Sequence, residues 1–293
     1  MARAEMSPGF TTSEISDRAE NKPFFPPEGK VREIHQETVL LLAAPAAILM
    51  QVAHPLVSQG VKDHSYFKEN LTRRLVHTVT TLNKLVFGTE KDSRLAAQHV
   101  NKVHRPVQGQ LSESVGTHQE GTSYNAKDPQ LLQWVWGTLV DADLNTYETF
   151  CKELSNKEKE SYYQEFKRIL PLLGGKRDQT PETYQDFRGY MNDMYESKTV
   201  HVSETAKNDI APYILLQASD KLPGKLITIL KPLSLPSEKI TAGLLPEPLR
   251  EQYGLMLTPV EQKAFDAIAG VNKLIPRMVR HYPIARQAEQ RDS

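Results

Sequence analysis

The sequence has almost no cysteine and no excess of charge of either sign. Cys151 is the only cysteine in 293 residues, which excludes an intrachain disulfide framework and any zinc or iron–sulfur site built from cysteines. Lys and Arg together number 36, as do Asp and Glu, so the formal net charge is zero. A nucleic-acid-binding protein usually has a basic surplus, so we expect no nucleic-acid partner. The single cysteine fits the cytoplasmic location that we expect.

Several catalytic motifs are also missing. The sequence has no HExxH zinc motif and no Glu-x-x-His pair for a helical di-iron site. It has no Gly-x-Gly-x-x-Gly or P-loop for a nucleotide, and no Gly-x-Ser-x-Gly elbow for a serine hydrolase. The segment Asp141-Ala142-Asp143 is a poor substitute for the acidic clusters that hold magnesium in ionising terpene cyclases. These absences argue against each of these reaction classes.

Long hydrophobic runs are scarce. The first thirty residues are polar, contain proline and lack the apolar core of a signal peptide, so we expect a flexible lead or an arm lying over the domain. The longest apolar stretch, Val39–Val57, is uninterrupted only as far as Met50. A membrane span needs about twenty apolar residues, so this stretch predicts a buried core helix. The sequence is also compatible with peripheral contact between the protein and a membrane surface.

Elsewhere, apolar residues recur at helical spacing, and alternating strand-like patterns are rare. The stretches 110–126 and 197–209 are polar and are predicted to be loops. We predict helix caps at Asp92 or Ser93, at Asp128, at Ser155 or Asn156, and at Thr180. The expected helices are Val31–Val57 with a kink at Pro45, Leu71–Phe87, Arg94–His104, Pro129–Leu154, Lys157–Leu173, Pro181–Glu196, Ile210–Gln217, Leu222–Leu233, Pro246–Tyr253, Pro259–Leu274 and Ile275–His281.

These patterns predict one all-α domain that encloses an apolar pocket. The expected boundaries are a flexible lead over residues 1–30, the helical domain over 31–285 and a polar tail over 286–293. No repeat of fixed period and no long low-complexity linker divides the domain.

Histidines are concentrated in one part of the chain. Five of the nine fall between residues 51 and 109, among apolar stretches: His54, His64, His77, His99 and His104. An apolar pocket with a few imidazoles can hold a metal, a haem or a substrate that needs a proton moved. Structural roles are the alternative. His104 would then be a hydrogen-bonded core residue, His54 would sit at the end of a helix, and His64 would be oriented by Asp63 or would tie down a turn.

Four blocks of sequence carry a family resemblance. They are AHPLVSQGVKDHSYF, LTRRLVHT, VHRPVQG with the later SYNAKDPQLLQWVWGTL, and LPEPLREQYGLMLTP. In this order and spacing they resemble the family of latex-clearing rubber oxygenases and the mycophenolate-pathway oxygenase catalytic domain, from about Val31 to Pro283. The resemblance implies an all-α, globin-like fold around a b-type haem. It also implies oxidation or cleavage of isoprenoid-like substrates with dioxygen.

The resemblance also implies roles for individual residues. His104 occupies the position of the family's proximal haem ligand, in His-Arg-Pro-Val-Gln-Gly. Arg74, His77 and Thr78 occupy the distal positions, where they would form hydrogen bonds to bound dioxygen. His77 replaces the family's Lys or Arg. His64 is the further candidate for a catalytic group near this site.

Three positions depart from the family pattern. Asn101 and Gln108 stand where the family has arginines, which are natural partners for haem propionates. Trp136 stands where the family has a histidine, and an indole suits a pocket that shapes a hydrocarbon. We assign Asn101 and Gln108 to the cofactor side, and His54, Trp134 and Trp136 to the substrate pocket. The departures leave open whether haem is retained.

Three functions remain possible from the sequence. The first is a haem-dependent oxygenase acting on a small apolar isoprenoid or terpenoid intermediate of specialised metabolism. The second is a haem-free member that uses the same pocket for an intramolecular cyclisation, such as a cycloaddition, in which holding the substrate in a reactive conformer lowers the barrier. The third is a carrier of an apolar ligand. We prefer the oxygenase. The sequence does not determine the oligomeric state.

Overall fold

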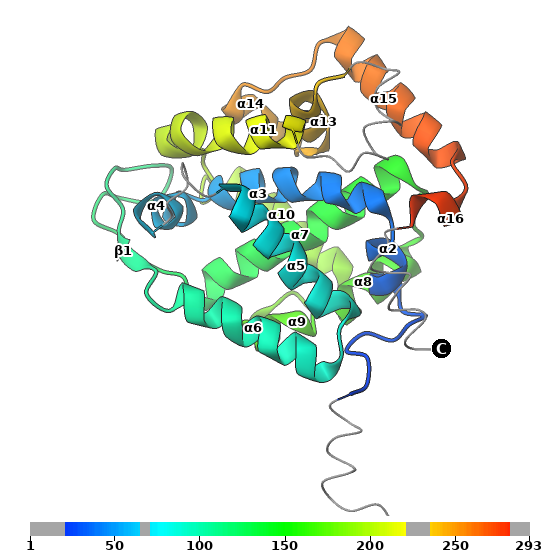
Figure 1. The fold of residues 1–293 in the computed structure, drawn as a ribbon. Coiled ribbons are helices and arrows are strands. Elements are labelled where there is room, and N and C mark those ends of the chain that lie inside the picture. The colour runs from blue at the N-terminus through cyan, green and yellow to red at the C-terminus, as the bar shows by residue number, and fades with distance from the viewer. Residues whose placement is uncertain (1–20, 65–70, 221–234, 282–293) are drawn as a thin grey trace, which may run out of the picture.

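The structure is a computed structural model that describes residues 21–64, 71–220 and 235–281, with the backbone alone for residues 71–77 and 216–220. Helices form most of this part of the chain (Figure 1). The one sheet in it pairs two three-residue strands, β1 (Gln108–Gln110) and β2 (Ser123–Asn125), in antiparallel register. The expected all-α class is therefore confirmed.

The centre of the domain is α7 (Pro129–Phe150), the longest described helix. Asp128 caps it by accepting a hydrogen bond from the backbone N–H of Gln130 at 2.8 Å, and Pro129 fits the first turn, where no amide donor is needed. Buried residues occur around its whole circumference, including Trp134 and Trp136. A helix that is apolar all round lies inside a domain, and α7 is enclosed by its neighbours.

The other helices form layers around α7. α3 (Ala43–Val52) packs along α7 on one side and against α11 (Ala211–Asp220) and α13 (Ser237–Leu244) on the other (Figure 1). α5 (Leu71–Phe87) and α6 (Glu90–His104) form a helical hairpin. The remaining elements are α2 (Lys30–His35), η1 (Thr38–Leu42), α4 (Pro55–His64), α8 (Asn156–Phe166), α9 (Ile169–Leu172), η2 (Arg177–Gln179), α10 (Tyr184–Glu196), the π-helix η3 (Thr205–Ile210), α14 (Glu247–Tyr253), α15 (Pro259–Leu274) and α16 (Arg277–Arg280).

The single helix expected over Val31–Val57 is wrong, because the chain is broken at two points. α2 ends before Glu37, whose backbone is extended (φ −77°, ψ 125°), and the short 3-10 helix η1 leads into α3. α4 then starts at Pro55 and lies at 103° to the preceding helical segment. Proline has no amide hydrogen to donate, so it suits the first turn of a new helix better than the last turn of an old one.

The flexible lead was expected to end at residue 30, but the chain packs against the domain before that. Phe24 and Phe25 are buried in the core. The backbone N–H of Phe24 donates to the carbonyl of Gly88 at 3.1 Å, and the N–H of Glu90 donates to Lys22 at 2.8 Å. The folded domain therefore begins earlier than residue 31.

Other expected boundaries were met or shifted by a few residues. Leu71–Phe87 and Pro259–Leu274 are helical over the predicted ranges, and Ser155 caps α8 as one of its two candidates. α10 begins after Thr183 rather than Thr180, because Thr183 forms a capping box with Asp186, whereas the Thr180 hydroxyl donates to the carbonyls of Lys176 and Arg177.

Several elements have no counterpart in the sequence prediction. The small β-ribbon lies partly in the stretch expected to be a loop, and the π-helix η3 forms the end of the loop expected over residues 197–209. α13 was not predicted. The helix expected over Leu222–Leu233 lies outside the described residues.

No single helix among residues 21–64, 71–220 and 235–281 is long and apolar enough to cross a membrane. The bent pair Thr38–Val52 and Pro55–His64 meets the length and composition of a span only when its two parts are taken together.

Candidate functional site

An apolar cavity lies between α4, the C-terminal end of α6, the β-ribbon and the first turns of α7. Its volume is about 180 Å³. The polar side chains that line it are His64, His104, Tyr124 and Gln51. Cavities with mainly apolar walls and a few polar groups are the usual form of a small-molecule site. The aliphatic walls are formed by Leu56, Val57, Val61, Val107, Leu131, Leu132 and Val135.

His104 reaches the cavity because it is the last residue of α6. The helix starts earlier than predicted, because its cap is Thr89 rather than Asp92 or Ser93. Thr89 and Asp92 form a capping box, in which each accepts a hydrogen bond from the other's backbone N–H. The helix then runs for fifteen residues, and its half-buried final side chain lies at the cavity wall beside Val107. The helix therefore places one imidazole against aliphatic side chains from α4 and α7.

His64, the last residue of α4, brings a second imidazole to the same cavity. Its Nε2 lies 3.0 Å from the backbone carbonyl oxygen of Gln108 in β1. Its ring meets the ring of Tyr124 edge-on, with centroids 6.2 Å apart. Of the roles considered for His64, the structure shows it joining α4 to the β-ribbon, and no hydrogen bond from Asp63 orients it in the described part of the chain.

Asp63 instead organises the polar edge of the cavity. The Tyr124 hydroxyl donates to Asp63 Oδ2 at 2.6 Å, and the Gln59 amide donates to Asp63 Oδ1 at 2.9 Å. Gln59 Oε1 in turn accepts from the Ser112 hydroxyl at 2.8 Å. Burial, followed by the hydrogen bond to Asp63, raises the pKa of Tyr124, so the phenol remains protonated and remains a donor.

Gly109 allows this arrangement in β1. A Cβ atom at Gly109 would lie 2.6 Å from the Tyr124 hydroxyl oxygen, closer than real Cβ atoms approach their neighbours. A larger residue here would move Tyr124 or the ribbon. From the sequence alone, no role was assigned to Tyr124 or to Gly109. The only sequence signal for Gly109 was its position at the end of VHRPVQG, one of the blocks that resemble the family.

The proposed distal residues lie on α5. The backbones of Arg74 and His77 are helical, and their side chains lie outside the described residues. Thr78 is exposed and does not line the cavity. The structure therefore brings together His64 and His104 from the predicted set, and Thr78 is not among the residues that line their cavity.

The two residues that replace family arginines have other contacts. The Asn101 side-chain amide donates to the backbone carbonyl of Leu172 in α9 at 2.9 Å. Gln108 is exposed, and its backbone carbonyl is the group that His64 contacts. Neither side chain is among those that line the cavity.

The two tryptophans are core residues of α7. Trp136 is buried, its ring packs against Tyr163, Phe166 and Phe187, and its indole N–H donates to the carbonyl of Phe166 at 3.3 Å. Trp134 is also buried, and its indole N–H donates to the carbonyl of Gln51 at 3.3 Å. Neither ring lines the cavity that His64 and His104 share.

His54 caps the start of α4. Its Nδ1 accepts a hydrogen bond from the backbone N–H of Leu56 at 3.3 Å, and its ring centroid lies 5.0 Å from that of His118. Burial, followed by the nearby charge of His118, lowers the pKa of His54 to about 3. The ring is therefore neutral near pH 7, and it lies at the start of α4.

Comparison with known proteins places the chain in a family. The family described as ER-bound oxygenase mpaB/B′/rubber oxygenase, catalytic domain, matches residues 31–273. The chain belongs to this oxygenase family. Two uncharacterised proteins, from Mycobacterium tuberculosis and Mycobacterium bovis, are each 26% identical over 246 residues, which cover 82% of this chain and 90% of the relative. No solved structure matches the chain.

This oxygenase family implies a haem, and the side chains of the cavity can be compared with the ligands that a haem needs. In the described part of the chain, no three His, Cys, Asp or Glu side chains cluster as ligands for a metal ion. A haem needs only one axial imidazole from the protein, and His104 beside aliphatic walls fits that requirement. The enclosed volume of about 180 Å³ is below the roughly 300–1,000 Å³ of most ligand pockets, so a haem would extend beyond these walls.

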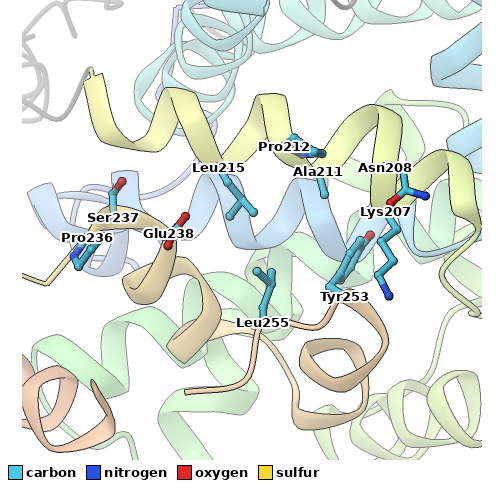
Figure 2. A pocket seen from close by; sticks show the side chains of 10 residues that line it. All are labelled: Lys207, Asn208, Ala211, Pro212, Leu215, Pro236, Ser237, Glu238, Tyr253 and Leu255. Carbon is cyan, nitrogen blue, oxygen red and sulfur yellow. The ribbon is translucent and has the colours of Figure 1, made fainter. Parts of the chain in front are cut away.

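The domain of this oxygenase family member has a second, larger hollow, which sequence reasoning did not anticipate. It has a volume of about 530 Å³ and lies between η3 and α11 on one side and α13, α14 and Leu255 on the other (Figure 2). It shares no lining residue with the His104 cavity.

Proposed function

We propose that the protein is a haem-dependent oxygenase that acts on an apolar isoprenoid or terpenoid intermediate of specialised metabolism. The observation that carries the proposal is the position of His104, a half-buried imidazole at the end of α6 in an aliphatic cavity, in a chain of an oxygenase family. When bound, a b-type haem supplies the binding and activation of dioxygen.

The protein side chains would hold and orient the reactants. His104 would hold the iron of a bound haem. The aliphatic side chains of Leu131, Leu132 and Val135 would exclude water and accept a hydrocarbon. Arg74 and His77 of α5 are the proposed distal hydrogen-bond donors, and the exposed Thr78 is the least suited of the three distal candidates.

Two observations favour the haem-free alternative as a second candidate. The Asn101 amide, which stands where the family has an arginine, already donates to the carbonyl of Leu172, and the described cavity of about 180 Å³ is smaller than most ligand pockets. In this alternative the cavity folds a polyene into a reactive conformer, and a donor such as His77 or Arg74 polarises an activating carbonyl.

Assays with a panel of unsaturated terpenoids distinguish these three functions by the products that form. The purified protein, loaded with haem, is incubated with each substrate in air and without oxygen. We expect products that contain both oxygen atoms of one dioxygen molecule, formed only in air and only with haem. An isomer of the substrate formed without oxygen or haem would establish the cyclase. Tight binding without any product would leave a carrier.

A further inference from the structure

The hollow between η3–α11 and α13–α14 has the size and walls of a binding site. Its volume of about 530 Å³ falls within the roughly 300–1,000 Å³ of most small-molecule pockets. Ala211 and Leu215 line it from α11, and Leu255 lines it from the chain after α14 (Figure 2). These side chains form an apolar trough along one face of α11.

Tyr253 closes the floor of this trough with its ring rather than its hydroxyl. Its side chain is buried, and the hydroxyl donates to the backbone carbonyl of Leu49 in α3 at 2.7 Å. The hydrogen bond fixes the ring and uses the polar end of the side chain elsewhere. A ligand would therefore meet an aromatic surface at this point.

The two ends of the trough carry opposite charges. Lys207, on the π-helix η3, lies at one end, and Glu238, in the first turn of α13, lies toward the other (Figure 2). Both are exposed, and neither forms an ion pair within the described residues. The neighbouring Asn208 amide already donates to Glu204 at 2.6 Å, so among the lining residues at this end Lys207 is the charged donor for a ligand.

The π-helix accounts for the position of this cation. A π-turn inserts an extra residue into a helix, and such turns often occur at functional sites. Here it covers Thr205–Ile210 and runs directly into α11, so Lys207 stands at the mouth of a trough whose wall is the next helix.

We propose that this trough binds an elongated hydrocarbon that ends in a carboxylate, such as a fatty or isoprenoid acid. The carboxylate pairs with Lys207, and the chain lies along Leu215, Leu255 and the ring of Tyr253. Glu238 disfavours the reverse orientation, because two carboxylates would then face each other.

The test measures binding of dodecanoate to the full chain by calorimetry, with uncharged dodecanol as the comparison. We expect dodecanoate to bind more tightly than dodecanol. Lys207→Ala should lower the affinity for dodecanoate by about fivefold, the value of a good exposed ion pair. It should leave the affinity for dodecanol unchanged. Lys263→Ala is the matched control, because Lys263 is also an exposed helical lysine but lies in α15.

Two further variants test the orientation and the location of the ligand. Glu238→Gln should raise the affinity for dodecanoate by about twofold, because it removes a like charge from the trough. A misfolded variant would lose affinity, so this gain would also show that the variant is folded. Leu255→Trp should fill the trough and weaken both ligands by about tenfold, while circular dichroism confirms that the variant is folded.

Three results would overturn the proposal: no binding of dodecanoate, equal binding of both ligands, or dodecanoate binding that Lys207→Ala and Lys263→Ala change alike. His104→Ala separates this site from the proposed oxygenase cavity. If dodecanoate occupied that cavity instead, His104→Ala would change its affinity and Leu255→Trp would not.

Discussion

At the scale of single residues, His54 shows how burial decides the role of a histidine. Its ring is buried, accepts a hydrogen bond from Leu56 and has a pKa of about 3, well below the usual value of 6.5. In the unfolded chain the ring gains a proton as the pH falls through 6.5, whereas in the folded protein it stays neutral until about pH 3. The stability that His54 contributes is therefore complete above pH 6.5 and is lost progressively as the pH falls toward 3.

We predict that His54→Asn removes this pH dependence. Asparagine retains a side-chain oxygen that can accept the hydrogen bond from the N–H of Leu56 but does not titrate. Between pH 7 and pH 5, the free energy of unfolding should fall by about 2 kcal/mol more in the wild type than in the variant. Urea unfolding at both pH values measures the difference. The exposed His99, replaced in the same way, is the control, and an equal effect at His99 would show that burial is not the cause.

Gly109 is required for a different reason, because the Tyr124 hydroxyl lies too close to its backbone to leave room for a side chain. We predict that Gly109→Ala lowers the free energy of unfolding by about 1–3 kcal/mol, because the new methyl group would displace the Tyr124 hydroxyl from Asp63. The cost should be smaller when Tyr124 is already Ala, which a double-mutant cycle measures. A cost that is the same in both backgrounds would contradict the proposed contact.

The sequence indicated part of the site at this scale. His64 and His104 could be selected because they stand in apolar stretches and in family-like blocks, and the structure brings them to one cavity. The partnership of Asp63 with Tyr124 could not be predicted, because it joins α4 to a β-ribbon sixty-one positions away along the chain. Trp134 and Trp136 were expected in the pocket, but an apolar side chain on a central helix fits the core equally well.

At the scale of elements, helices were predicted well where apolar residues recur at helical spacing and leave a polar face. Leu71–Phe87 and Pro259–Leu274 have clear polar faces and recognisable ends, and both match the structure. The run from Val39 to Val57 has no polar face, so its sequence does not show where one helix stops and the next begins. The β-ribbon and η3 are too short to produce a periodic signal.

Helical glycines with free space offer a test of the helix assignments. A Cβ atom added at Gly189 in α10 or Gly270 in α15 meets nothing within 4 Å. Each change to Ala should therefore raise the free energy of unfolding by about 0.5–1 kcal/mol, because alanine loses less backbone entropy than glycine. Thermal or urea unfolding measures the gain. Gly88→Ala should have the opposite sign, since its Cβ would lie 2.2 Å from the Lys84 carbonyl oxygen. Destabilisation at Gly189 and Gly270 would contradict their helical environments.

At the scale of the whole molecule, the C-terminal end of the described chain meets the segment between α2 and η1 at an ion cluster centred on the buried Glu37. Glu37, between α2 and η1, is buried, and its carboxylate lies 3.5 Å from Arg280 Nε and 3.7 Å from Arg277 Nε in α16. α16 lies beyond residue 273, where the family match ends. The cluster therefore attaches a segment outside the matched region to the core.

Burial raises the pKa of Glu37, and the two arginines oppose that shift. We predict that Arg280→Ala destabilises the protein by about 3 kcal/mol at pH 7, because it leaves a buried carboxylate with one weaker partner. The raised pKa favours the protonated acid in the folded state, so the loss should shrink as the pH falls and Glu37 takes up a proton. Adding Glu37→Gln to Arg280→Ala should recover part of the stability at pH 7. A loss that is independent of pH would contradict this explanation.

The central claim is that His104 holds a haem, and an absorption spectrum during haem titration tests it most directly. We predict a sharp Soret band that saturates at about one haem per chain in the wild type and in His99→Ala, which alters an exposed histidine of the same helix. His104→Ala should lose the band while keeping its helical circular dichroism. A wild-type protein that takes up no haem, or a Soret band unchanged in His104→Ala, would contradict the claim.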